Sequence, residues 1–106
     1  MFARNVSARL KPNSITQFTE TFEKEIVPML RKQPGFRDEL TLASDDGLHV
    51  TAISIWETKE QAEAYNTAGY PEVLKTLDKV LDGPPKVRLS KITSSTLHKP
   101  AAVVAA

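Results

Sequence analysis

The stretch that decides the fold is Val50–Tyr65, VTAISIWETKEQAEAY, an apolar segment that ends on the only tryptophan and leads into an alanine-rich helix. Successive side chains of a strand point to opposite sides. One face of the predicted strand therefore carries Val50, Ala52, Ser54 and Trp56. The other face is also largely apolar, so both faces need cover. Thr58, with Gln61 three residues later, predicts the capped start of a helix.

The segments on either side predict three more strands and one more long helix. Alternating apolar and polar residues indicate strands over 2–10, 36–44 and 86–97. Ser14 and Gln17 form a second capping pattern, and apolar residues follow it at three- and four-residue steps, which is typical of an amphipathic helix. Pro28 removes an amide donor within that helix and predicts a kink.

Turn residues fix how these elements connect. Asp45, Asp46 and Gly47 predict a tight turn, because Asp and Gly tolerate positive backbone angles, so the second and third strands form a hairpin. Gly69 and Pro71 predict an interruption of the second helical region.

The resulting order, strand, helix, strand, strand, helix, strand, predicts an α+β, ferredoxin-like βαββαβ domain with a four-stranded antiparallel sheet and both helices on one side. The domain is expected to span residues 1–98, with a flexible tail over 99–106 that lacks amphipathic periodicity. The uncovered sheet face is expected to carry Asn5, Ser7, Arg9, Arg37, Glu39, Thr41, Ala43, Val50, Ala52, Ser54 and Trp56. This mixture favours a cavity or a subunit interface.

Composition excludes several classes of function. The 106 residues carry a formal net charge of +1 with no basic cluster, which argues against nucleic acid and anionic membranes as partners. No apolar run is long enough to span a bilayer, and the N-terminus lacks a signal-peptide core, so a cytoplasmic protein is expected. The absence of cysteine excludes thiolate chemistry, and His49 and His98 have no partner at a ligand spacing, so no metal site is expected.

Two segments carry a family resemblance: KPNSITQFTETFEKEIVPMLRKQPGF over 11–36 and SIWETKEQAEAY over 54–65. A helix ending in Pro-Gly-Phe, and a Trp-Glu pair closing the third strand, resemble the antibiotic-biosynthesis-monooxygenase-like domains over about residues 2–97. The resemblance implies a homodimer whose two sheets join into a dimeric α/β barrel. Members include cofactor-free oxygenases that oxidise phenols and anthrones to quinones, haem-degrading enzymes, and proteins without a known reaction.

The resemblance also implies candidate site residues. It places Trp56 at the mouth of the barrel cavity, where its ring offers a flat surface to an aromatic ligand, and Asn5 on the matching face of the first strand. Tyr65 is a further candidate catalytic residue. The expected substrate-binding residues are Arg9, Arg37, Ser54 and Asn66. From the residues alone, Glu39, Arg9 and Arg37 could pair within the cavity and orient an acidic or phenolic group, or they could form salt bridges at an interface or rim.

Two substitutions distinguish this chain from the family. Asn66 stands where haem-degrading relatives carry a histidine, which argues against haem. Ala52 stands where quinone-forming relatives carry an asparagine, so their set of proton-handling residues is not reproduced. The function that the resemblance implies is a cofactor-independent, monooxygenase-like oxidoreductase that acts on or binds a small aromatic or phenolic molecule. The alternative is a non-catalytic binding or dimerisation module, in which Trp56 packs the strand end or the dimer seam.

Overall fold

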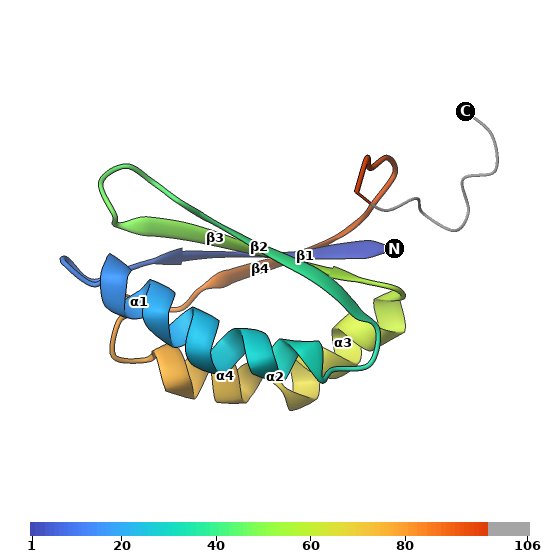
Figure 1. The fold of residues 1–106 in the computed structure, drawn as a ribbon, viewed down its shortest axis with the longest axis horizontal. Helices are drawn as coiled ribbons and strands as arrows, with labels where there is room; N and C mark the ends of the chain where they lie inside the picture. Colours follow the sequence, from blue (N-terminus) through green and yellow to red (C-terminus); the bar gives the residue numbers. More distant parts are fainter. Residues whose placement is uncertain (98–106) are drawn as a thin grey trace.

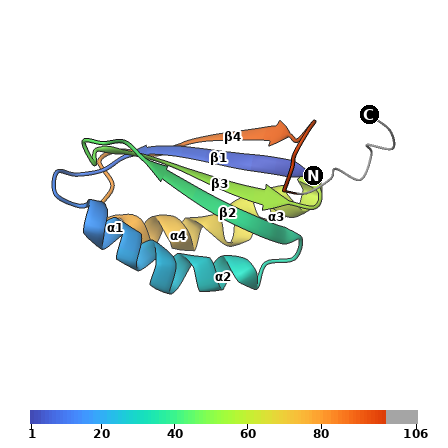
Figure 2. The same ribbon diagram turned by 45° about the horizontal axis from the view of Figure 1, so that its top comes forward.

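Four antiparallel strands form one sheet in the spatial order β2-β3-β1-β4, as Figure 2 shows. The computed structural model describes residues 1–97. The strands are β1 (Phe2–Arg9), β2 (Phe36–Ala43), β3 (His49–Trp56) and β4 (Lys86–Lys91). The central pair, β1 and β3, is in register along its whole length, from Phe2 opposite Trp56 to Arg9 opposite His49. This arrangement confirms the ferredoxin-like α+β fold.

The helices all lie on one side of this sheet (Figure 1). The first helical region consists of α1 (Ile15–Thr21), η1 (Phe22–Ile26) and α2 (Val27–Arg31), and the second of α3 (Lys59–Ala68) and α4 (Tyr70–Leu77). The core between the layers includes Phe18, Phe22, Ile26, Leu30, Val50, Trp56, Ala62, Tyr65, Val73 and Leu77. Among the described residues, no helix covers the opposite face of the sheet.

The irregularities of the first helical region lie where proline predicts them. The backbone widens into a π-helical turn over Phe22–Ile26, and the Val27 amide donates to the carbonyl of Phe22, five residues back. Pro28 follows immediately and cannot donate to the preceding turn. The break that was expected as a kink is therefore present as a π segment, one of the common ways in which a helix accommodates such a defect.

Both helices begin where they were predicted to begin, but only one of the two predicted capping hydrogen bonds is present. The Thr58 side chain accepts a hydrogen bond from the Gln61 amide at 3.1 Å. The reciprocal bond is absent, because Gln61 Oε1 is buried without a partner. Ser14 precedes α1 but makes no side-chain cap, so that capping prediction is wrong.

The predicted turns are present. The 44–49 hairpin closes with the Ser44 amide donating to the His49 carbonyl at 2.9 Å, and Gly47 has φ +72°. Gly69 separates α3 from α4 as expected. The last strand ends at Lys91 rather than at residue 97. The predicted tail, residues 99–106, lies outside the described residues. Within those residues, no helix is long and apolar enough to cross a membrane.

The prediction that Val50, Ser54 and Trp56 of β3 lie on the uncovered face of the sheet is wrong. Trp56 has 0% exposure, and Val50 and Ser54 are also buried, so this face packs under the helices and not on the open side. Both faces of β3 are apolar, and composition therefore could not decide between them. The helices cover the face that carries Trp56, whose ring stacks on Tyr65 of α3.

The faces of β2 are exchanged in the same way. Glu39 and Thr41 lie on the helix side, whereas Leu40 and Leu42 are 55% and 50% exposed on the open side. The register shifts between Phe36 and Asp38, so Phe36 packs against Trp56 on the helix side while the leucines point away. A bulge of this kind inserts one residue and reverses the alternation along a strand.

Candidate functional site

A small cavity lies between the sheet and the helices. Its volume is about 50 Å³, and it is lined mainly by apolar side chains from β1, β3 and the helices, with Arg4, Glu39, Ser54, Tyr65 and Tyr70 as its polar groups. Two larger hollows adjoin it. One, of about 390 Å³, runs along α1, η1 and β2 and reaches Glu39, and the other, of about 500 Å³, is bounded by α3 and β4 and reaches Arg4.

An aromatic stack closes one end of this region. The ring of Trp56 stacks on Tyr65 of α3 with centroids 4.9 Å apart and meets the edge of Phe36 at 5.6 Å. The indole Nε1 donates to Ser54 Oγ at 2.8 Å, so the only buried polar atom of the tryptophan is satisfied. Trp56 is not among the residues that line the cavity. It therefore positions Ser54 and Tyr65, which do line it.

A buried arginine is the most unusual feature of the site. Arg4 lies on β1, has 3% exposure, and places its guanidinium carbon 4.0 Å from the Tyr70 ring centroid and 5.1 Å from that of Tyr65. Its Nη2 donates to Asn66 Oδ1 at 2.7 Å, whereas Nε has no hydrogen-bond partner. Burial lowers the pKa of Arg4, and the two tyrosines oppose that change. Arginine nevertheless remains charged in proteins, so a positive charge sits inside the site.

Both tyrosines keep their protons under ordinary conditions. Burial raises the pKa of Tyr65 to about 12, against the opposing effect of Arg4. Burial also raises the pKa of Tyr70, again opposed by Arg4. The Tyr70 hydroxyl is buried and donates its proton to no acceptor, although the Arg4 guanidinium lies beside it and acts to lower its pKa. Tyr70 therefore offers an unused donor beside a cation.

A carboxyl group lies at the other side of the cavity. Arg4 pairs with Ser54 across the sheet, and Ser54 pairs with Glu39, so the three side chains form a row across neighbouring strands. Burial raises the pKa of Glu39, while a hydrogen bond from Thr41 Oγ1 at 2.6 Å opposes the rise. A desolvated carboxylate near an apolar cavity is a stronger base than an exposed one. The row therefore combines a potential proton acceptor with a fixed cation.

The structure brings four of the predicted site residues together. Trp56, Tyr65 and Ser54 form one hydrogen-bonded and stacked group, and Asn66 holds Arg4. Asn5 lies on the open face of the sheet, beside Ser7 and Arg88.

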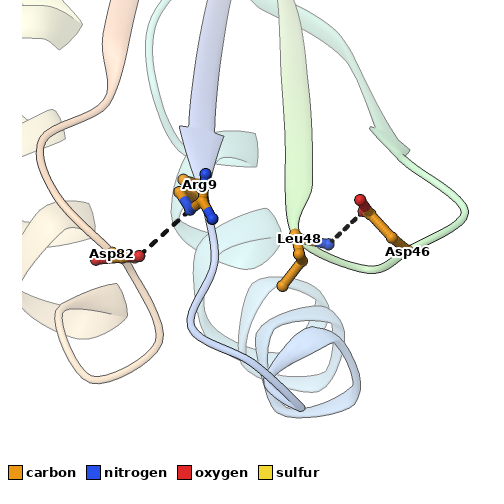
Figure 3. Close-up of polar contacts among 4 residues, drawn as sticks. All are labelled: Arg9, Asp46, Leu48 and Asp82. Atoms are coloured by element: carbon orange, nitrogen blue, oxygen red, sulfur yellow. Dashed lines mark hydrogen bonds and ion pairs between the residues drawn. The ribbon is translucent and has the colours of Figure 1, made fainter.

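The two predicted arginines lie outside the cavity. Arg9 pairs with Asp82 at 3.4 Å at the end of β1, next to the hairpin in which Asp46 accepts from the Leu48 amide (Figure 3). Arg37 forms an ion pair with Glu57 at 3.2 Å, and both side chains of this pair are substantially exposed. The structure therefore gives neither arginine a place in this site.

Sequence reasoning missed Arg4 and Tyr70, and it expected Glu39 on the open face of the sheet rather than under the helices. Arg4 alternates with the apolar residues Val6 and Ala8 on the helix side of β1, and a charge at a core position of an alternating strand is the pattern that could have revealed it. Among the described residues, no group of three or more metal-ligating side chains is present.

Comparison with known proteins gives one family and a set of similar folds. The antibiotic biosynthesis monooxygenase family model matches residues 1–75. A monooxygenase of Streptomyces coelicolor from the gene ActVA-Orf6, solved with nanaomycin D, superposes with a TM-score of 0.76 at 23% identity, covering 92% of each chain.

Two other solved structures are similar in fold. The protein of unknown function NE2512 from Nitrosomonas europaea has a TM-score of 0.76 at 12% identity, covering 92% of this chain and 94% of its own. The protein Rv0793 from Mycobacterium tuberculosis has a TM-score of 0.69 at 14% identity, covering 90% and 97%. No functionally curated protein matches the chain significantly.

Proposed function

Because this chain belongs to the antibiotic biosynthesis monooxygenase family, we propose that it binds a small aromatic, phenolic molecule between its helices and its sheet and oxidises it with molecular oxygen without a bound cofactor. The observation that carries the proposal is the cavity, which is walled by Tyr65 and Tyr70 and contains the polar row of Arg4, Ser54 and Glu39. The S. coelicolor monooxygenase of similar fold was solved with nanaomycin D as its ligand, which supports an aromatic substrate.

The chemistry requires a protein that excludes water and stabilises negative charge. Oxidation of an anthrone-like phenol by oxygen gives a quinone and water, and the substrate must first lose a proton to become electron-rich. Glu39 is the group in the cavity suited to accept that proton from a ring carbon of an anthrone, which leaves the negative charge on the oxygen at the far side of the ring system. Fixed donors in a dry site then stabilise the anion without reorganisation.

The size of the cavity sets how the ligand enters. At about 50 Å³ it has room for no more than a few water molecules, whereas pockets for drug-sized ligands span about 300–1,000 Å³. A bicyclic ligand must therefore extend into an adjoining hollow or displace side chains. The groove beside β4, which shares Arg4 and Tyr70 with the cavity, offers the space.

Binding and turnover can be tested separately. Naphthoquinone- or anthrone-like compounds should quench the fluorescence of Trp56 saturably, and the anthrone should drive oxygen uptake above its spontaneous rate. Ala52→Leu fills the cavity and should abolish both, whereas Ala64→Leu adds the same volume on the exposed side of α3 and should change neither. Linear quenching would reject the pocket, and saturable binding without oxygen uptake would leave the non-catalytic binding module.

The open sheet face carries the second part of the proposal, a homodimer. Ile53 and Ile55 lie on this face because they alternate with buried residues, and Ile53 pairs with the exposed Leu40. A contiguous apolar patch of this kind usually marks an association surface. The patch is therefore built from Leu40, Leu42, Ile53 and Ile55, and not from Ala52 and Trp56, which lie under the helices.

Light scattering after gel filtration tests the dimer. Leu40→Lys with Leu42→Lys should convert it to a monomer, because like charges would meet across a two-fold axis. Val87→Lys removes an exposed apolar residue from the helix side of β4 and should leave the dimer intact. A wild-type monomer at micromolar concentration would contradict this part of the proposal.

A further inference from the structure

We propose that Arg4 and Tyr70 form a binding site for an ionised oxygen, so that the ligand is an aromatic molecule held as its phenolate or enolate. This inference rests on the proposed function and specifies the charge state of the ligand. Its basis is the pair of unused donors, Arg4 Nε and the Tyr70 hydroxyl, which are both buried and both belong to residues that line the same two hollows.

Within residues 1–97, the charge of Arg4 has no counter-ion. Its partners are neutral: it donates to the amide oxygen of Asn66, and it lies against the rings of Tyr65 and Tyr70 and beside the Tyr70 hydroxyl. The ion pairs found in that range join exposed side chains on the outside of the molecule. A buried charge is costly unless it is paired and hydrogen-bonded. A bound anion would supply the missing partner.

The geometry suits an oxygen attached to a flat ring. Asn66 and the Tyr70 ring hold the guanidinium in place, so its orientation is fixed before a ligand arrives. An ionised oxygen can accept from the guanidinium and from the Tyr70 hydroxyl, while the attached ring lies along the apolar groove beside Leu89 and Val87. Charge-assisted hydrogen bonds of this kind are shorter and stronger than neutral ones.

Glu39 restricts the position of the anion. This carboxyl group lies two strands away from Arg4, with Ser54 between them, and the two side chains form no ion pair. An anion at the Glu39 side would be repelled, whereas one at the Arg4 side meets the only buried cation among the described residues. The ionised oxygen therefore belongs on the β4 side of the cavity.

The decisive comparison uses two ligands that differ in charge but not in ring shape. Lawsone, a hydroxynaphthoquinone, is ionised at neutral pH, and its methyl ether cannot ionise. Hydrogen bonds to charged groups contribute enough for the wild type to bind lawsone about tenfold or more tightly than the ether in isothermal titration calorimetry. Arg4→Gln should bring the two affinities close together, and Arg31→Gln, which removes an exposed cation from α2, should leave the preference unchanged.

Tyr70→Phe separates ligand binding from packing. It keeps the ring under Arg4 but removes a hydroxyl whose proton has no acceptor in the free protein, so the free energy of unfolding should stay the same or rise. Its preference for lawsone should nevertheless fall, about threefold or more. A residue with a purely structural role would not lose the preference for lawsone while the free energy of unfolding stays the same or rises. If circular dichroism shows that Arg4→Gln does not fold, Tyr70→Phe alone still tests the anion site.

The outcomes distinguish this inference from the function on which it rests. If lawsone and its ether bind wild type equally, or if Arg4→Gln and Tyr70→Phe both keep the preference, the anion site is refuted while the aromatic pocket stands. If neither compound binds saturably, the proposed function fails and the inference fails with it.

Discussion

The hydrogen bond between Ser54 and Trp56 gives a prediction whose size follows from burial. Ser54→Ala removes the acceptor of the Trp56 indole N–H. Trp56 has 0% exposure, and its N–H has no other hydrogen-bond partner. A buried donor left without a partner costs about 1–3 kcal/mol. Because the alanine side chain fits the space of the serine, little packing is lost. We therefore expect the free energy of unfolding to fall by about 1–3 kcal/mol.

A double-mutant cycle isolates that cost from other effects. In the Trp56→Phe background the donor is gone, so Ser54→Ala should cost less than about 1 kcal/mol there, and the coupling energy should reach about 1–2 kcal/mol. Urea unfolding followed by far-ultraviolet circular dichroism measures all four proteins, since the phenylalanine variants lack tryptophan fluorescence. Ser94→Ala, an exposed serine after β4, is the matched control and should stay within about 0.5 kcal/mol of wild type.

The reasoning would be refuted if Ser54→Ala cost the same in both backgrounds. Equal costs would mean that the indole finds another partner, or that the serine stabilises the protein without the hydrogen bond. The stack of Trp56 on Tyr65 would then have to hold the ring by packing alone.

Three further predictions follow from other parts of the structure. Gly35 and Gly83 both have positive φ, but a Cβ at Gly35 would collide with the Gln61 side chain, whereas one at Gly83 meets nothing. In urea unfolding, Gly83→Ala should lower the free energy of unfolding by about 1 kcal/mol and Gly35→Ala by clearly more. Equal losses of stability would contradict the contact between Gly35 and Gln61. Because the folded-state pKa of Tyr65 is raised from 10.0 to about 12, its contribution to stability is intact below pH 10 and is lost as the pH rises through about 12, so Tyr65→Phe should flatten the fall in unfolding free energy over that range. Haem should not be bound or turned over, because Asn66, which accepts a hydrogen bond from Arg4, stands where the family resemblance places the ligating histidine. A stoichiometric Soret shift on titration with haemin that depends on one histidine would overturn this.

Local sequence patterns were sufficient for the order of the elements. The Thr58 cap, the 44–49 hairpin and the break at Gly69 depend on interactions within a few residues, and each is present where it was predicted. The helix stripe that begins at Ile15 likewise shows its buried face directly in its spacing. These features need no knowledge of distant contacts, so one sequence can reveal them.

Which side of each strand faces the helices depends on contacts that the local pattern does not contain. On β3 both faces are apolar, and on β2 a bulge between Phe36 and Asp38 reverses the alternation. A period-two pattern predicts that side chains alternate, but it assigns a side only where one face is clearly polar. Trp56 was therefore expected on the open face, although its ring stacks under α3.

The two exchanged faces have a common physical origin. The helix side of the sheet contains Arg4, Ser54 and Glu39, polar groups that a core built for stability alone would avoid, while the open side of β2 exposes Leu40 and Leu42. Local rules tend to fail where a surface serves a ligand or a partner. On the proposals made above, the polar row is retained because it binds and activates the substrate, and the leucines are retained because a second copy covers them. Glu39, Leu40 and Leu42, which a stability-based interpretation placed on the wrong side of β2, are therefore the positions at which substitution should change function more than folding.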